Sequence, residues 1–169
     1  MKDQFILLYD QFFDDVYRYI LYKVGKKWDA DDLVSEVFRK AFVRQSSLRQ
    51  DSNEKAWLMT IARNTVIDYY RKKKNVIYSD QVEDYMEHEV FSANGDLEDH
   101  LDCVKNSLSF MPEEDREIIN MRYFADMKYR DIGQVLGKTE QAIRTRMFRL
   151  TKKMGVLVTK CLEGVKERG

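Results

Sequence analysis

The chain has 169 residues, 44% of them hydrophobic and 34% charged, and its 29 Lys and Arg balance 29 Asp and Glu. This length suits one domain or two small ones. No apolar run approaches the roughly 18 residues that a membrane span needs, and the N-terminal sequence MKDQFILLYD lacks the architecture of a secretory signal. We therefore expect a cytoplasmic protein.

The cysteine pattern agrees with a reducing compartment. Cys103 and Cys161 are far apart and match no metal or redox spacing. We expect both to be reduced and to serve only in packing.

The balanced total hides a division of charge along the chain. Residues 1–75 contain 15 Lys and Arg and 11 Asp and Glu, a net charge of +4. Residues 76–117 contain 2 and 13, a net charge of −11, and residues 118–169 contain 12 and 5, a net charge of +7. Two basic ends separated by an acidic middle indicate nucleic-acid contacts at both ends.

Two helices are predicted before the first loop. Apolar residues spaced three and four apart predict a helix over about 3–24, which Gly25 ends. Asp29 is a good N-cap for a second helix that runs to about Arg44. The polar stretch 45–53 is predicted to be a loop.

The segment AWLMTIARNTVIDYYRKKK, residues 56–74, predicts a third helix capped by Asn53 or Asp51. Its buried stripe should comprise Leu58, Ile61, Ala62, Thr65, Ile67 and Tyr69. The other faces carry Arg63, Asn64, Asp68 and Arg71, and the segment ends on the cations Arg71, Lys72, Lys73 and Lys74. Cations beside an amide side chain favour a nucleic-acid surface, although a solvated helix end gives the same pattern.

The chain becomes acidic and linker-like after this helix, up to about residue 95. Asp96 can cap a helix over 96–110, and Pro112 stands at the start of another over 113–125. There is no convincing run of alternating strand character. The pattern therefore predicts an all-helical fold of two small domains joined by an acidic linker.

Residues 127–150 have the spacing of a helix-turn-helix, whose second helix lies in the DNA major groove. A helix near 128–136 ends at Gly137, and Thr139 caps a last helix to at least Met154. The apolar positions are Ile132, Val135, Leu136, Ile143, Met147 and Leu150. The outer face of the last helix carries Gln141, Arg144, Thr145, Phe148 and Arg149. Such side chains can read base edges, with Arg146 and Lys152 on phosphates, unless the helix is only basic and amphipathic.

Three motifs together resemble a known family. They are DDLVSEVFRKAF at 31–42, AWLMTIARNTVIDYYRKKK at 56–74 and FMPEEDREIINMRYFADMKYRDIGQVLGKTEQAIRTRMFRL at 110–150. In order and spacing they resemble the two-domain bacterial RNA polymerase sigma factors of the extracytoplasmic-function group. The resemblance implies a sigma region 2-like domain at 1–75, an acidic flexible linker at 76–95 and a sigma region 4-like helix-turn-helix domain at 96–169.

The resemblance implies contacts with core RNA polymerase. The clamp helices of the polymerase would bind Asp31, Asp32, Leu33, Glu36 and Phe38. The polymerase flap would lie near Ile118, Ile119 and Tyr123. From the residues alone, Leu33 and the three flap residues could equally belong to the core.

By the same resemblance, the loop 46–53 and the helix 56–74 would hold the minus-ten promoter element as melted, non-template single strand. A flipped base would enter a pocket at Leu48 and Asn64, with Arg49, Asp51 and Ser52 nearby. Backbone phosphates would contact Arg63, Arg71, Lys72 and Lys73. Relatives often have an aromatic residue where this chain has Leu48, which leaves base stacking there open. We expect Trp57 to anchor the core rather than to wedge the DNA apart.

The double-stranded minus-thirty-five element would contact the second domain through Thr139, Gln141, Arg144, Thr145, Arg146, Phe148 and Arg149. Gln141 and Ala142 replace a Gly-Thr pair that is common in the family, which leaves the recognised sequence open.

The expected function is to direct core polymerase to specific promoters and to help melt the minus-ten element. An anti-sigma factor is a further expected partner, and no enzyme activity, metal or cofactor is expected. His100 and Cys103, with Asp99 and Asp102, lack the second Cys or His pair of a metal site. Two alternatives are a stand-alone helix-turn-helix regulator, which needs no polymerase, and a nucleic-acid enzyme, which needs a metal-binding carboxylate cluster.

Overall fold

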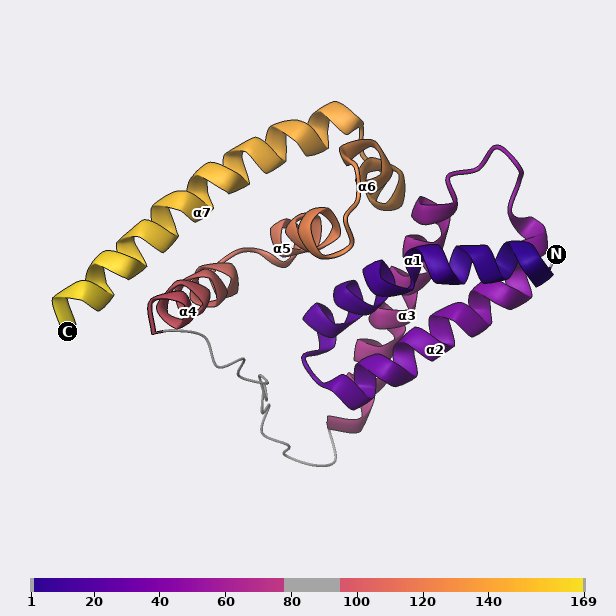
Figure 1. Cartoon of the computed structure of the whole chain (residues 1–169), viewed down its shortest axis with the longest axis horizontal. Helices are drawn as coiled ribbons and strands as arrows, with labels where there is room; N and C mark the ends of the chain where they lie inside the picture. The colour runs from indigo at the N-terminus through magenta and orange to yellow at the C-terminus, as the bar shows by residue number, and fades with distance from the viewer. Residues whose placement is uncertain (1, 78–94, 169) are drawn as a thin grey trace.

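The computed structural model describes residues 2–77 and 95–168, and these residues form helices, turns and loops without a strand (Figure 1). Most of the predicted linker 76–95 lies outside the described residues. Within the described ranges, every helix is too short or too polar to span a membrane. The all-helical prediction is therefore confirmed, with three long helices before the undescribed stretch and a second group of helices after it.

The first group consists of α1 (Lys2–Val24), α2 (Lys27–Arg44) and α3 (Glu54–Ile77). The chain turns after α1 at Gly25, whose φ of 70° lies in the left-handed region that glycine adopts without strain. The prediction that Asp29 caps α2 is wrong. The N-cap residue is Lys26, without a side-chain bond, and the Asp29 carboxylate instead accepts a hydrogen bond of 2.7 Å from the Tyr69 hydroxyl.

The segment between α2 and α3 begins with the short 3₁₀ helix η1 (Gln45–Ser47) and continues as a loop. At its end the Asn53 Oδ1 atom accepts the Ala56 N–H at 3.0 Å. This bond satisfies one of the free N–H groups at the start of α3. The prediction of an Asn53 cap is confirmed.

The second group consists of α4 (Gly95–Ser109), α5 (Glu113–Ile119), the π-helical turn η2 (Asn120–Phe124), α6 (Tyr129–Leu136) and α7 (Glu140–Arg168). The helix predicted over 113–125 is thus α5 continued by η2. The last helix is longer than the sequence pattern required, since it continues well beyond Met154.

The helix-turn-helix geometry is as predicted. Gly137 ends α6 with a left-handed φ of 67°, and the Thr139 Oγ1 atom accepts the Ala142 N–H at 3.1 Å to cap α7. Gly133 lies where α6 approaches this turn, and a Cβ atom there would be 2.5 Å from the Lys138 carbonyl oxygen. The close approach of α6 and the turn therefore requires a residue without a side chain.

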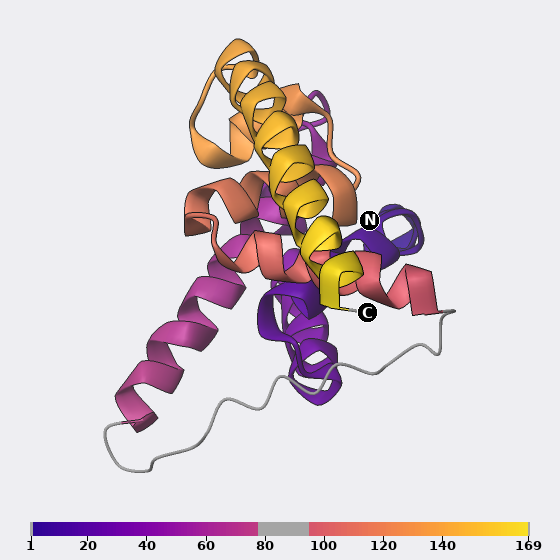
Figure 2. The same ribbon diagram turned by 90° about the vertical axis from the view of Figure 1, so that its left-hand side faces the viewer.

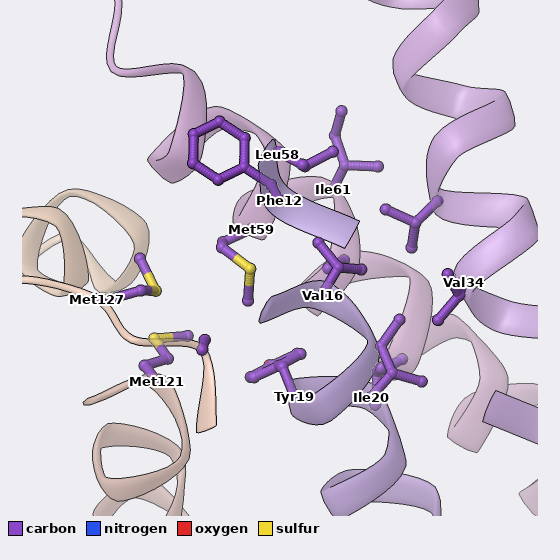
Figure 3. Close-up of a cluster of buried hydrophobic side chains, with 14 of the residues drawn as sticks. Phe12, Val16, Tyr19, Ile20, Val34, Leu58, Met59, Ile61, Met121 and Met127 are labelled. Atoms are coloured by element: carbon purple, nitrogen blue, oxygen red, sulfur yellow. The ribbon is translucent and has the colours of Figure 1, made fainter. Parts of the chain in front are cut away.

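The two groups of helices share a hydrophobic core (Figure 3). Tyr19 of α1 and Met59 of α3 pack against Met121 of η2 and Met127 of the loop that follows it. Each of these four side chains is at most 1% exposed. A smaller cluster on the second group contains Leu108, Met111, Ile119 and Leu150.

The two cysteines form a disulfide, with their Cα atoms 5.6 Å apart. The expectation of two reduced packing residues is therefore wrong. Cys103 is on α4 and Cys161 is on the C-terminal half of α7, and these helices pack side by side (Figure 1 and Figure 2). Helix pairing brings together two residues that are 58 positions apart in the sequence.

Replacing Gly133 by Ala is expected to destabilise the protein. The new methyl group would overlap the Lys138 carbonyl oxygen, which is backbone and cannot rotate away. We expect the free energy of unfolding to fall by about 1–3 kcal/mol, as measured by urea denaturation. Gly155→Ala is the matched control, because a Cβ at Gly155 in α7 meets nothing within 4 Å. Its expected effect is a gain of about 0.5–1 kcal/mol, and equal losses in both variants would contradict the packing argument.

Candidate nucleic-acid interfaces

The N-terminal part of α7 has one buried and one exposed face. Ile143, Met147 and Leu150 are at most 5% exposed and belong to the apolar clusters. The predicted outer face is exposed at every position: Gln141, Arg144, Thr145, Phe148 and Arg149. Phe148 is 63% exposed, although removing an aromatic side chain from water lowers the free energy. Such a face is suited to a binding partner.

Neighbouring side chains hold this face in position. The Arg144 guanidinium donates to Glu140 Oε1 at 2.8 Å and lies 5.6 Å from the centre of the Tyr129 ring. The Lys152 ammonium lies 4.5 Å from the centre of the Phe148 ring. Cation–π contacts of this kind restrict the side chains that they join. The face is therefore partly ordered before any partner binds.

Arg146 does not belong to the exposed face. Its Nε and Nη2 atoms lie 2.7 and 2.6 Å from Asp115 Oδ1, and its Nη1 atom lies 3.2 Å from Glu114 Oε1. A hydrogen bond from Lys138 and the charges of Arg146 and Lys138 hold the pKa of the Glu114 carboxyl below its usual range. The phosphate contact expected of Arg146 stays a prediction, and in this arrangement its guanidinium joins α7 to carboxylates of α5.

A hollow of about 720 Å³ opens beside the exposed face of α7. Its cationic and polar lining includes Lys138, Thr139, Gln141, Thr145, Arg149 and Lys153. Lys138 and Lys153 were not among the predicted site residues. The spacing of Lys153 from Arg149, one turn along the same helix, is the sequence signal that could have found it.

On α3 the predicted buried stripe is largely correct. Leu58, Ile61, Ala62 and Thr65 are buried, but Ile67 is 39% exposed and the adjacent Val66 is buried in its place. Asn64, Arg71 and Lys72 are exposed, as a surface for an external partner requires. Lys73 is half-buried, with its ammonium 5.7 Å from the centre of the Tyr69 ring.

The loop before α3 places its predicted residues in two environments. Arg49 and Asp51 are exposed, and the half-buried Ser52 closes a turn through a 3.0 Å bond from its N–H to the Arg49 carbonyl. Leu48 packs with Trp57 against the main core, as expected for an anchor at Trp57. Both line a hollow of about 220 Å³. Asn64 is not among its lining residues, so this hollow is not the predicted pocket between Leu48 and Asn64.

Arg63 contacts the second group of helices. Its Nε atom lies 3.5 Å from Glu117 Oε1, and the Glu117 carboxylate also contacts the Lys23 ammonium and accepts a hydrogen bond from the Tyr19 hydroxyl. Glu117 is only 6% exposed. Burial, followed by the nearby Glu117 charge, raises the pKa of Tyr19 well above its usual value. One of the predicted phosphate contacts is thus occupied by a carboxylate of α5.

The start of α3 is covered by the same group of helices. The Asn53 amide donates to Asp131 Oδ1 at 2.5 Å, and the Lys55 ammonium donates to the Asp126 carbonyl at 2.7 Å. These bonds and the Arg63 ion pair place α5, α6 and the loop before α6 against the predicted single-strand surface. In this arrangement that surface is only partly open.

The residues predicted to bind core polymerase are not equally accessible. Asp32 is exposed, whereas Asp31, Leu33 and Glu36 are half-buried. Phe38 is 5% exposed, with its ring 4.6 Å from that of Tyr9. The expectation that Phe38 contacts an external partner is therefore corrected, because this side chain is part of the core.

The exposed face of α2 contains other residues that the sequence reasoning missed. Trp28 is 84%, Phe42 is 48% and Val43 is 67% exposed. Together with Asp32 and Arg39 they recur at the three-and-four spacing of a helix that meets another helix. Two hydrogen bonds of 2.8 Å from the Arg39 guanidinium contribute most to lowering the pKa of Glu36 to about 2.

Burial decides which of the predicted flap residues belong to the core and which are exposed to a partner. Ile118 and Ile119 are at most 7% exposed and belong to the core, whereas Tyr123 is 64% exposed. Among the described residues no group of three His, Cys, Asp or Glu side chains could hold a metal ion. Cys103 is already bonded to Cys161.

Comparison with known families assigns the two groups of helices separately. The family described as Sigma-70 region 2 matches residues 8–76, and the family described as Sigma-70, region 4 matches residues 101–154. These ranges contain the exposed cations of α3 and the exposed face of α7.

Several relatives match most of the chain, among them the following two. It is 32% identical over 167 residues to the ECF RNA polymerase sigma factor BldN of Streptomyces coelicolor, covering 92% of this chain but only 61% of that relative. It is 27% identical over 151 residues to the ECF RNA polymerase sigma factor SigM of Bacillus subtilis, covering 89% of this chain and 92% of the relative.

Solved structures have the same fold. The sigma factor RpoE, in complex with the anti-sigma factor NepR from Bartonella quintana, has a TM-score of 0.68 and 26% identity, with 94% of this chain and 96% of that chain covered. CnrH, in complex with the cytosolic domain of CnrY, has a TM-score of 0.69 at 22% identity, with 95% and 90% covered.

Arg146→Ala is expected to destabilise the second group of helices. The substitution leaves Asp115, which is only 8% exposed, without its guanidinium partner. We expect the free energy of unfolding to fall by about 1–3 kcal/mol, as for other polar groups that lose a buried partner, in urea denaturation. The exposed neighbour Arg149 is the control, since Arg149→Ala should change stability by less than about 0.5 kcal/mol. Equal stability of the two variants would show that Arg146 has no structural role.

Proposed function

Because the chain belongs to the extracytoplasmic-function group of RNA polymerase sigma factors, we propose that it joins core RNA polymerase, directs it to specific promoters and helps to melt the minus-ten element. Proteins of this family initiate transcription by binding and are not enzymes. The observation that carries the proposal is the exposed face of α7 in a chain whose two halves match sigma regions 2 and 4.

The first part of the proposal is that residues 96–169 read the double-stranded minus-thirty-five element. Arg144 and Arg149 would donate pairs of hydrogen bonds to guanine edges, and Thr145 and Phe148 would contact thymine methyl groups. Phosphate contacts would come from Lys138 and Lys153 at the hollow beside α7. Thr139 and Gln141 at the start of the helix complete this surface.

The second part is that residues 1–75 bind the melted non-template strand at the minus-ten element. Arg71, Lys72 and Lys73 would neutralise the backbone. Asn64 would contact an extruded base through its exposed amide, helped by the loop residues Leu48, Arg49, Asp51 and Ser52. Arg63 would add a phosphate contact only after it separates from Glu117.

The third part is that α2 binds a helical surface of core polymerase. Asp32 is exposed, and Asp31, Leu33 and Glu36 are partly accessible beside it. Trp28 and Phe42, near the two ends of α2, would supply the apolar anchors that helix-on-helix contacts need.

In the structure the two groups of helices are in contact, and we call this the closed arrangement. It would be the inactive form of the protein. Glu117, Asp126 and Asp131 engage side chains near the predicted single-strand surface, so the two groups must separate before this surface is fully available. We propose that a cytoplasmic anti-sigma factor favours a closed form, in keeping with the complex of the sigma factor RpoE with the anti-sigma factor NepR. The predicted linker, most of which lies outside the described residues, would connect the two groups when they separate.

Run-off transcription with purified core polymerase tests the whole proposal. The template would be a promoter enriched from random DNA by binding to this chain and polymerase together. We expect specific initiation only when the chain is added. Duplex binding without any effect on polymerase would instead indicate a stand-alone helix-turn-helix regulator.

Arg149→Ala is expected to weaken binding to the enriched minus-thirty-five duplex without unfolding the protein. Loss of one bidentate base contact costs about 1–3 kcal/mol, a reduction of roughly 5- to 150-fold in affinity. Fluorescence anisotropy at fixed salt measures the change. Lys160→Ala, exposed on the same helix but far from this face, should bind like the wild type. Equal affinities of all three proteins would remove Arg149 from the interface.

Glu117→Gln is expected to loosen the closed arrangement. The substitution preserves the shape of the side chain but removes the charge that Lys23 and Arg63 contact. We expect affinity for a single-stranded minus-ten oligonucleotide to rise roughly fivefold, equivalent to about 1 kcal/mol, because Arg63 is released. Anisotropy measures the affinity, and amide exchange in residues 118–136 should accelerate with it.

The control for this experiment is Glu113→Gln, which changes an exposed carboxylate on the same helix. It should leave both affinity and exchange unchanged. If Glu117→Gln also leaves the affinity and the exchange rate unchanged, this ion cluster does not hold the two groups of helices together.

A further inference from the structure

The chain contains two cysteines, and they are bonded to each other. Cys103 is 1% exposed on α4, whereas Cys161 is half-buried on α7. Nothing in the proposed contacts with DNA or polymerase uses this disulfide. It lies away from the exposed face of α7, near the opposite end of that helix.

The disulfide fastens the part of α4 that has little other support. Residues 95–102 are all exposed, so Cys103 is the first buried residue of α4. Leu97 and Leu101 are 55% and 44% exposed and contribute little apolar burial. The apolar cluster that joins α4 to α7 contains Leu108 and reaches along α7 only to Leu157. Cys161 lies one turn beyond that point.

The disulfide also encloses the DNA-binding unit. The bonded residues are 58 positions apart, and α5, η2, α6 and the first part of α7 lie between them. A crosslink around a loop of this size restricts the unfolded chain and thereby favours the folded unit. The bond is therefore placed to influence both the end of α4 and the whole helix-turn-helix.

We propose that Cys103 and Cys161 form a reversible thiol–disulfide site whose redox state sets how firmly α4 is held against α7. The cytoplasm keeps most thiols reduced, and disulfides that do form there are usually transient or redox-sensing. Oxidation is expected to strengthen promoter binding, because α7 carries the exposed DNA-binding face. This consequence rests on the proposed function. An ordered helix loses less conformational freedom when it binds.

The exchange reaction balances with a dithiol as the reductant. A thiolate of the dithiol attacks Sγ of Cys161, the more exposed residue, and the bond between the two sulfurs breaks. The electron pair leaves with Sγ of Cys103, which takes up a proton. The second thiol of the reductant then attacks the mixed disulfide, releasing Cys161 as a thiol and the reductant as a disulfide. Oxidation is the reverse, with a small-molecule disulfide as the electron acceptor.

The direct test uses the full-length wild-type chain, oxidised with glutathione disulfide or reduced with dithiothreitol. Alkylation followed by mass spectrometry should count no free thiol in the first sample and two in the second. Hydrogen exchange of amides in residues 95–103 and 158–168 should be about tenfold faster after reduction, because local opening becomes easier. Two persistent thiols under oxidising conditions, or equal exchange in both samples, would overturn the proposal.

The matched variant carries Cys103→Ser and Cys161→Ser together. Its exchange should resemble that of the reduced wild type and should not respond to either reagent. A redox response of the same size in this variant would assign the effect to another part of the protein. The comparison of oxidised and reduced wild type needs no variant, so it decides the question even if the double variant does not fold.

Run-off transcription and minus-thirty-five duplex binding test the functional consequence. Both should be stronger with the oxidised wild type than with the reduced protein, and the double variant controls for effects of the reagents on polymerase. Equal binding in both states, despite different exchange rates, would overturn the link to promoter binding. Failure of transcription in both states would count against the proposed sigma function, while the thiol count and exchange rates would still decide the disulfide proposal.

Discussion

Met121 and Met127 are fully buried against Tyr19 and Met59, so helices that flank the undescribed stretch share one core (Figure 3). Burial of such side chains is worth about 1.5–3 kcal/mol each, which is more than a single exposed ion pair contributes. This apolar contact determines where the polar groups around it lie. It places Glu117 between Tyr19, Lys23 and Arg63.

The shared core therefore links the stability of the fold to the accessibility of the predicted single-strand surface. The same contact that buries the methionines brings α6 and the loop before it onto the start of α3, where Asn53 and Lys55 bind Asp131 and Asp126. The exposed face of α7 and the cations at the end of α3 lie outside this contact. In the proposed mechanism, duplex recognition and single-strand recognition thus have different requirements, since only the second needs the two groups of helices to separate.

The arginines of the chain show how a neighbour changes the role of a charge. Arg144 and Arg149 remain on the exposed face of α7, where Glu140, the carboxylate that Arg144 contacts, is itself exposed. Arg146 is held by carboxylates of α5, and Arg63 is held by Glu117. A guanidinium in such a pair is already satisfied, so it gains less from a phosphate than an exposed one does. Basic residues in a DNA-binding sequence are therefore not equivalent.

Local patterns in the sequence predicted most of the helices, the helix-turn-helix and the exposed face of α7, because these depend on residues three or four positions apart. It also carried the motifs that identify the family. Packing between helices set the burial of Phe38, the ion pairs of Arg63 and Arg146, and the disulfide between Cys103 and Cys161. Their partners come from other helices, up to 58 positions away, and local periodicity contains no information about which helices pack together.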